Sequence, residues 1–120
     1  MAVHGSCHCG GVRIEVPTAP EWIGSCNCHN CRKTGWLVAY YPDDGKVRVS
    51  GETAQYVHGD RMIAFLHCPT CACGVQWVST GESYGRVGVN ARLLDGFELR
   101  DGRYLFDGRE LEVRFLENAG

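Results

Sequence analysis

The sequence predicts a mainly β fold, and two observations carry that prediction. Short stretches in which apolar and polar residues alternate recur along the chain, and turn-forming residues separate them. The chain also contains 16 glycines, a residue that is common in the tight turns between short strands. With 120 residues, of which 44% are hydrophobic and 22% charged, it has the length and composition of a single globular domain, residues 1–120.

The expected strands follow one another along the chain. In the first, Val12, Ile14 and Val16 alternate with charged residues, which is the pattern of a half-buried strand. Pro17 and Pro20 end it. Further strands are expected at residues 21–24, 36–41, 46–50, 54–58, 62–67, 75–79, 84–94, 97–99 and 111–115.

Two pairs of these strands are expected to be neighbours. Gly51 and Glu52 separate 46–50 from 54–58, so these segments are predicted to form a hairpin. Strands 62–67 and 75–79 are predicted to flank a tight turn that carries cysteines. The segment 32–34 is the one helical candidate.

Charge and hydropathy argue against two classes of partner. Twelve basic and 14 acidic residues give a net charge of −2, without a run of either sign, so no nucleic-acid surface is expected. No stretch approaches the roughly 18 apolar residues that a membrane-spanning helix needs. The start, MAVHGSCHCGG, lacks the basic and apolar regions of a signal peptide, so a cytoplasmic location is expected.

The eight cysteines form three clusters. In a reducing compartment such clusters are typical of metal ligands rather than of disulfides. Cys26, Cys28 and Cys31 form the central one, with C-x-C-x-x-C spacing. Zinc is the usual metal for thiolates held this closely. Three protein ligands leave one tetrahedral position open, which is the feature that separates a catalytic zinc from a structural one.

The motifs around the clusters resemble one known family. The stretches GSCHCGGVRIEV, SCNCHNCRKTG and HCPTCACGVQW occur in this order, with KVRVSGETAQYV and VGVNARLLDG at fitting places. They are similar to the glutathione-dependent formaldehyde-activating enzyme family, which includes centromere protein V-like proteins. The resemblance covers roughly residues 5–96. It implies a small, mainly β domain of twisted antiparallel sheets that carries two zinc ions.

The resemblance also implies ligands and a reaction. One structural zinc is expected on Cys7, Cys9, Cys68 and Cys71, and closing a loop of about 60 residues in this way would stabilise a small core. The central cysteines are expected to hold the second zinc and to act as catalytic residues, Cys26, Cys28 and Cys31. There the thiol of glutathione, or of a similar small molecule, would add to an aldehyde such as formaldehyde, which is carbon–sulfur lyase chemistry. The oligomeric state is expected to be a monomer or a homodimer.

One departure from the family pattern leaves alternatives open. Ala72 follows the C-x-x-C motif where glycine is usual, and Cys73 is an eighth thiol beside seven expected ligands. Cys73 is either a small buried hydrophobe, a fourth ligand of the central zinc, or a reactive thiol. A closed central site would favour a non-catalytic, two-zinc structural or protein-interaction module. A reactive thiol would favour a redox sensor.

Residues after the central cluster are candidates for a binding site. Arg32 and Lys33 would attract a substrate carboxylate or form a solvated pair on a short helical turn. Trp36, Tyr40 and Tyr41 would wall a pocket or pack in the core.

Overall fold

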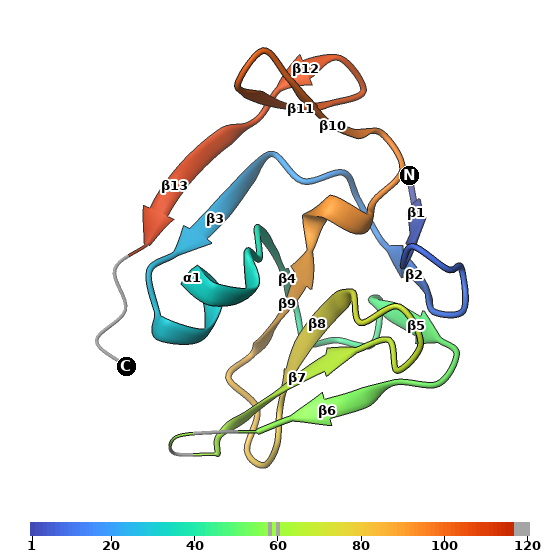
Figure 1. Ribbon diagram of the computed structural model, residues 1–120, viewed down its shortest axis with the longest axis vertical. Coiled ribbons are helices and arrows are strands. Elements are labelled where there is room, and N and C mark those ends of the chain that lie inside the picture. The colour runs from blue at the N-terminus through green and yellow to red at the C-terminus, as the bar shows by residue number, and fades with distance from the viewer. Residues whose placement is uncertain (58, 60, 117–120) are drawn as a thin grey trace.

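The computed structural model describes residues 1–57, 59 and 61–116. These residues form thirteen strands, one short α-helix and one 3-10 turn, and the strands make three sheets (Figure 1). The mainly β fold predicted from the sequence is therefore confirmed. None of the helices in the described part of the chain is long and apolar enough to cross a membrane.

The largest sheet has seven strands in the described residues, in the order β13-β3-β4-β9-β8-β7-β6. Its members are β3 (Trp22–Cys26), β4 (Val38–Pro42), β6 (Ala54–Tyr56), β7 (Ile63–His67), β8 (Gly74–Ser79), β9 (Arg86–Asn90) and β13 (Glu112–Leu116). Neighbouring strands are antiparallel except for β13, which pairs in parallel with β3. The expectation of antiparallel sheets is therefore confirmed except at this edge, where the chain returns from a smaller sheet, residues 97–110, and pairs in parallel with β3.

Two smaller sheets flank the large one (Figure 1). The first is made of β1 (Val3–Ser6), β2 (Arg13–Val16) and β5 (Arg48–Ser50). The second is made of β10 (Phe97–Arg100), β11 (Arg103–Phe106) and β12 (Arg109–Glu110). Strands β1, β11 and β12 had no counterpart among the expected strands.

The hairpin predicted for 46–50 and 54–58 is wrong. Strand β5 pairs with β2, and β6 pairs with β7 in the large sheet, while residue 58 lies outside the described residues. At Gly51 the backbone has a φ of 99° and passes so close to Gly11 that a Cβ there would collide with the Gly11 carbonyl. Gly51 thus carries the chain from one sheet to another rather than through a hairpin turn.

The segment predicted as one strand at 84–94 is two elements. Strand β9 ends at Asn90, whose side-chain oxygen accepts a hydrogen bond from the Arg92 N–H at 3.3 Å and starts the 3-10 turn η1 (Ala91–Leu93). The short polar side chain of Asn90 therefore competes with the strand and ends it. The expected strands 62–67 and 75–79 do pair, as β7 and β8.

Helix α1 (His29–Thr34) is longer than the expected segment 32–34. Cys28 is its N-cap, and the sulfur of Cys28 accepts a hydrogen bond from the Cys31 N–H at 3.2 Å. Gly35 ends the helix with a φ of 77°, and its N–H bonds to the Cys31 carbonyl. The central C-x-C-x-x-C motif is therefore the strand-to-helix junction between β3 and α1.

The large sheet separates two apolar clusters. On β4, Ala39 and Tyr41 face the main core, while Val38 and Tyr40 face a second cluster. We call this second side the aromatic face, made of Trp22, Trp36, Tyr40, Phe65 and Trp77. The three central cysteines pack against this face.

Candidate metal centres and the adjoining cleft

The structure brings together the four cysteines that the family resemblance implies as one metal site. Their sulfur atoms all lie within 4.8 Å of one another, in the set Cys7, Cys9, Cys68 and Cys71. Two of these residues follow β1, and the other two lie in the turn between β7 and β8. The sulfur of Cys9 is 3.6 Å from that of Cys7 and also 3.6 Å from that of Cys68.

These distances fit a metal site and not a disulfide. A disulfide holds its sulfurs about 2.05 Å apart. Tetrahedral zinc–thiolate bonds of about 2.3 Å place neighbouring sulfurs about 3.8 Å apart. All eight cysteines are free thiols in the structure. We call the set Cys7, Cys9, Cys68 and Cys71 the four-cysteine site; its donors could hold one metal ion.

Backbone N–H groups point at the sulfurs of the four-cysteine site. Such donors stabilise the thiolate form, which is the form that binds metal. The bonds measure 3.3–3.5 Å and run from Gly11 to Cys9, from Val12 to Cys7, and from Thr70 and Cys71 to Cys68.

The thiols of this site differ in acidity. The N–H groups of Cys73 and Cys9 lower the pKa of Cys71 to about 5. At Cys9 the Gly11 N–H acts in the same direction, but the neighbouring thiols Cys7 and Cys68 raise the pKa to about 11. Four thiolates therefore repel one another unless a cation lies between them, as a bound metal would.

The central cysteines form a second, smaller cluster. The sulfurs of Cys26, Cys28 and Cys31 lie within 4.8 Å of one another. Cys26 is the last residue of β3, and the other two belong to the cap and first turn of α1. The Cys28 N–H donates to the Cys26 sulfur at 3.4 Å. We call these three residues the central site, and they too could hold a metal ion.

Burial and hydrogen bonds shift the pKa values of Cys28 and Cys31 in opposite directions. At Cys28 burial acts to raise the pKa, but the N–H of Cys31 and the thiols of Cys31 and Cys26 bring it below the ordinary value. Burial, together with the thiols of Cys28 and Cys26, raises the pKa of Cys31 well above its usual range. The thiols of Cys28 and Cys31 thus differ in acidity, and a cation beside them would be needed to ionise both.

Among the described side chains, no fourth ligand joins the central site. Cys73, the alternative fourth ligand, lies elsewhere: it packs against the main core beside Cys71. The backbone N–H of His8 points at its sulfur, and the Cys71 and Cys7 thiols act on its charge. The structure therefore places Cys73 next to the four-cysteine site and not at the central site.

Gly74 lies between the four-cysteine site and the side chains that pack around the central site. Gly74 opens β8 directly after the third cysteine cluster, and a Cβ at this position would lie 2.5 Å from the Trp36 indole. Trp36 in turn contacts the Phe65 ring edge to face, with centroids 5.6 Å apart. The Gly74 carbonyl accepts a hydrogen bond from the buried Asn90 amide at 2.9 Å. Trp36 can pack beside the central cysteines because residue 74 has no side chain.

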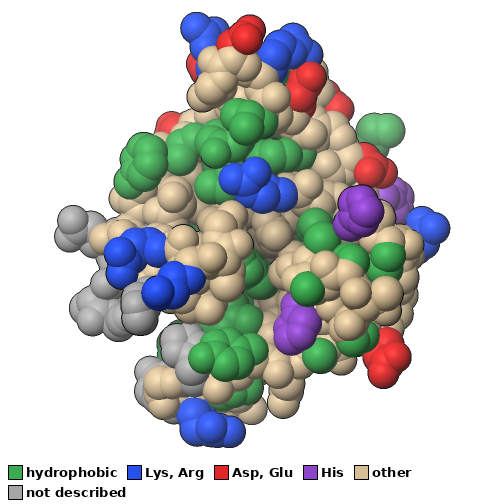
Figure 2. Space-filling model, in the orientation of Figure 1, with side chains coloured by type: hydrophobic (Ala, Val, Ile, Leu, Met, Phe, Trp, Pro, Cys, Tyr) green, Lys and Arg blue, Asp and Glu red, His purple; other side chains and the backbone are tan. Residues whose placement is uncertain are grey.

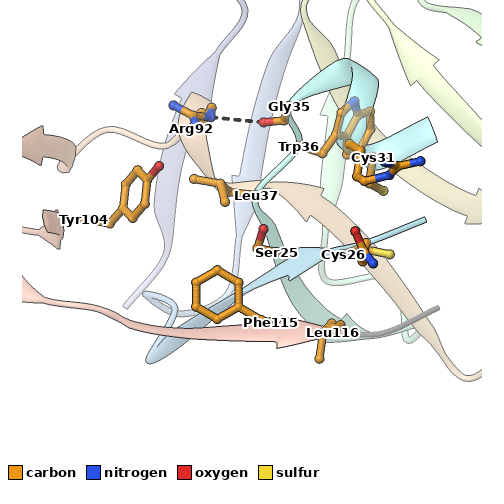
Figure 3. Close-up of a pocket in the computed structure, with 12 residues that line it drawn as sticks. Ser25, Cys26, Cys31, Gly35, Trp36, Leu37, Arg92, Tyr104, Phe115 and Leu116 are labelled. Atoms are coloured by element: carbon orange, nitrogen blue, oxygen red, sulfur yellow. Dashed lines mark hydrogen bonds between the residues drawn. The ribbon is translucent and has the colours of Figure 1, made fainter. Parts of the chain in front are cut away.

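A cleft of about 640 Å³ adjoins the central site (Figure 3). It lies between α1, the end of β3, η1 and the β10–β12 sheet, and Figure 2 shows apolar side chains gathered on this face with basic side chains beside them. Its lining includes Cys26 and Cys31 of the central site, together with Ser25, Asn27, Arg32, Gly35, Trp36, Leu37, Arg92, Tyr104, Phe115 and Leu116.

Arg92 connects this cleft to the end of α1. Its Nε donates to the Gly35 carbonyl at 3.2 Å, and its guanidinium lies 5.7 Å from the centre of the Tyr104 ring. In Figure 3 the Cys26 sulfur lies on the side of its residue that faces away from Tyr104 and Phe115. The cleft therefore meets the central site from one side, while the sulfurs pack against the aromatic face on the other.

The residues expected to bind substrate fall in different places. Arg32 lines the cleft, whereas Lys33 is exposed outside its lining. Trp36 is both a cleft wall and a core residue. Tyr40 lies on the aromatic face, and Tyr41 is buried on the opposite side of the sheet, where its hydroxyl donates to the Thr18 carbonyl.

Several cleft residues were absent from the sequence-based candidates. Three of them come from the last part of the chain, which the family motifs did not cover: Tyr104, Phe115 and Leu116. The alternation of Val113 and Phe115 indicates a strand, but nothing in the sequence says that this strand pairs with β3.

The comparison with protein families is decisive. The model for the glutathione-dependent formaldehyde-activating enzyme family matches residues 2–103. The chain belongs to this family. Family membership covers all three cysteine clusters, whereas Tyr104, Phe115 and Leu116 lie beyond the matched residues.

A solved structure supports the fold. The chain is similar to a protein from Rhodobacter sphaeroides whose crystal structure is known, with a TM-score of 0.70 and 28% sequence identity. The match covers 82% of this chain and 93% of the other. The comparison with curated protein sequences gives no significant match.

Proposed function

We propose that the central site holds a zinc ion and that the protein is a carbon–sulfur lyase-type enzyme, which adds a small thiol such as glutathione to an aldehyde such as formaldehyde, or catalyses the reverse. One observation carries this proposal. Three cysteine sulfurs lie within 4.8 Å of one another, and the described side chains supply no fourth ligand. Membership of a glutathione-dependent family supports the choice of thiol.

The central site suits a thiol substrate in several ways. Zinc bound by Cys26, Cys28 and Cys31 would supply a thiolate by lowering the pKa of the substrate thiol. The N–H groups of Cys28 and Cys31 hold negative charge on the protein's own sulfurs. On the other side of the site, the buried rings of Trp36 and Phe65 pack in the same cluster as the three cysteines.

The cleft suits the body of such a substrate. Its volume falls within the roughly 300–1,000 Å³ range of small-molecule sites. Arg32 and Arg92 border it, and guanidinium groups are good partners for the carboxylates of glutathione. Tyr104 and Phe115 add apolar contact area.

The proposed reaction balances without an oxidant or a reductant. The thiol sulfur forms a bond to the carbonyl carbon, the carbon–oxygen π bond breaks, and the oxygen takes up the proton that the thiol released. The same addition proceeds in water without a catalyst. Activity therefore means a rate above this background.

The four-cysteine site has a different role in this proposal. A zinc ion there would join the segment after β1 to the β7–β8 turn and stabilise one domain over residues 1–120. Thiols at both sites must remain reduced, which suits a cytoplasmic protein.

Zinc content and exchange rate together test the proposal. Cys28→Ser is the informative variant, because serine is a good N-cap and preserves the start of α1 while removing one sulfur ligand. We expect native mass spectrometry to find two zinc ions in the wild type and one in the variant. NMR exchange spectroscopy should find that wild-type protein accelerates formation and breakdown of the glutathione–formaldehyde adduct, and that the variant loses at least about 100-fold of this acceleration. A variant that loses one zinc but keeps the full rate would contradict the proposal.

A further inference from the structure

The aromatic face carries one arginine, Arg86, to which the described residues offer no anionic partner. The guanidinium of Arg86 lies 4.5 Å from the centre of the Tyr40 ring. In the described part of the chain, no carboxylate lies within ion-pair distance of it; the ion pairs of arginine there involve Arg100, Arg103 and Arg114. The side chain is also exposed, so its outer N–H groups are accessible to a ligand.

Tyr40 lies between this arginine and the central site. Its side chain packs in the same cluster as the three cysteines. Burial raises the pKa of the Tyr40 hydroxyl, and the charges of Arg86 and of the central thiols act on it in opposite directions. Arg86, Tyr40 and the central site thus form a row along one face of the sheet.

Two glycines leave room for the aromatic rings beside the sheet. Gly24 precedes Cys26 by two residues, on the same face of β3, and a Cβ there would lie 3.1 Å from the Tyr40 ring. Gly88 follows Arg86 by two residues on β9, and a Cβ there would overlap the Trp77 indole. Because both positions lack side chains, the rings of Tyr40 and Trp77 lie close against the sheet.

A second stacked arginine on this face offers a comparison. Arg114 lies 4.1 Å from the centre of the Trp22 ring, and it forms an ion pair with Glu112. Trp22 is adjacent to Tyr40, with ring centroids 5.6 Å apart. The two arginines therefore share the same type of aromatic support, but Arg114 already has a carboxylate partner.

We propose that Arg86 binds a carboxylate of the substrate that reacts at the central site, so that the site selects carboxylate-bearing compounds over uncharged ones. This inference rests on the proposed function. The carboxylate belongs either to the thiol, as in glutathione, or to the aldehyde.

The physical reason lies in the charge of the central site. Three thiolates on one divalent cation leave a net negative charge, which repels an anionic substrate over a few ångströms. A guanidinium on the same face offsets this repulsion. Stacking on Tyr40 holds the guanidinium in place and leaves its N–H edges available for a bidentate contact with a carboxylate.

Ligand binding to the zinc-loaded protein tests the inference without turnover. All three tryptophans, Trp22, Trp36 and Trp77, lie on the aromatic face, so their fluorescence reports binding there. In one arm, glutathione is compared with its diethyl ester, in which the carboxylates are blocked. In the other, glyoxylate is compared with acetaldehyde. The proteins are the wild type, Arg86→Ala, Arg86→Lys and the matched control Arg114→Ala.

In one of the two arms, we expect Arg86→Ala to weaken binding of the charged ligand about tenfold and to leave the uncharged ligand unaffected. Arg86→Lys should recover part of the loss, and Arg114→Ala should bind like the wild type. The arm that responds identifies the source of the carboxylate.

Two results would overturn the inference: no charge-dependent loss in either arm, or an equal loss in Arg114→Ala. Adduct exchange, measured separately, distinguishes this from failure of the proposed function. Protein that binds carboxylates through Arg86 but does not accelerate exchange would refute the reaction and leave the carboxylate site in place.

Discussion

The two cysteine sites differ in how much of the chain each one joins. In the four-cysteine site, sulfurs 59 residues apart in the sequence, those of Cys9 and Cys68, lie 3.6 Å apart. In the central site, Cys26 and Cys31 belong to one strand-to-helix junction. A metal at the first site would close a long loop, and a metal at the second would only join residues that are already neighbours.

This difference predicts that one site contributes to folding stability and the other to reactivity. Loop closure by a metal restricts the unfolded chain, so the four-cysteine site is expected to contribute to folding free energy. The central site borders a cleft and has no fourth described ligand, so it is expected to contribute to reactivity instead. The predictions below test that division.

Removing one ligand of the four-cysteine site should have the largest effect. Cys68 is almost fully buried and accepts N–H bonds from Thr70 and Cys71. We expect Cys68→Ser to lower the free energy of unfolding by about 4 kcal/mol or more, equivalent to a fall in Tm of roughly 15 °C. Differential scanning calorimetry measures this, with Cys28→Ser as the matched control. Equal destabilisation by both variants would contradict the division of roles.

The two sites should also differ in how fast a chelator removes their metal ions. The central site borders the cleft and has one ligand fewer, so a chelator is expected to remove its metal at least about ten times faster than the metal of the four-cysteine site. Native mass spectrometry during chelation should detect a folded species with one metal ion. In Cys28→Ser the fast phase should be absent. Simultaneous loss of both ions would count against two independent sites.

Substitution of Gly74 tests whether side-chain packing near one site affects metal binding at the other. An added Cβ in Gly74→Ala would press on the Trp36 indole, and we expect destabilisation of about 1–3 kcal/mol. The displaced Trp36 should also weaken metal binding at the central site more than at the four-cysteine site. Gly81→Ala is the control, because a Cβ there has no neighbour within 4 Å. Urea unfolding of both variants measures the destabilisation, and metal titration measures the change in affinity at each site.

The smallest effect is expected at Cys73. Its thiol lies beside the four-cysteine site without joining the set of four sulfurs. We expect Cys73→Ser to retain two metal ions by native mass spectrometry and to keep the exchange rate of the wild type. Loss of the ion that a chelator removes first would mean that Cys73 is a ligand of the central site, and the enzyme proposal would then lose its open position.

The cysteine sites were more predictable than the sheet around them. Spacing alone grouped Cys26, Cys28 and Cys31, because residues this close in sequence are also close in space. Strand pairing depends on distant contacts, so the alternation around Val49 indicated a strand but not its partner β2. The cleft was missed for the same reason: Phe115 and Tyr104 reach it through tertiary contacts that no local pattern encodes.

The parallel pairing of β13 with β3 sets an order of events during synthesis. Leu116 lies opposite Cys26, and its carbonyl accepts a hydrogen bond from the Asn27 N–H at 2.8 Å. A ribosome releases Cys7 to Cys71 well before residue 116, so the four-cysteine site can close while the edge beside Cys26 is still unpaired. The nascent chain could then complete the four-cysteine site first, and the surroundings of the central cysteines only later, once β13 has been translated.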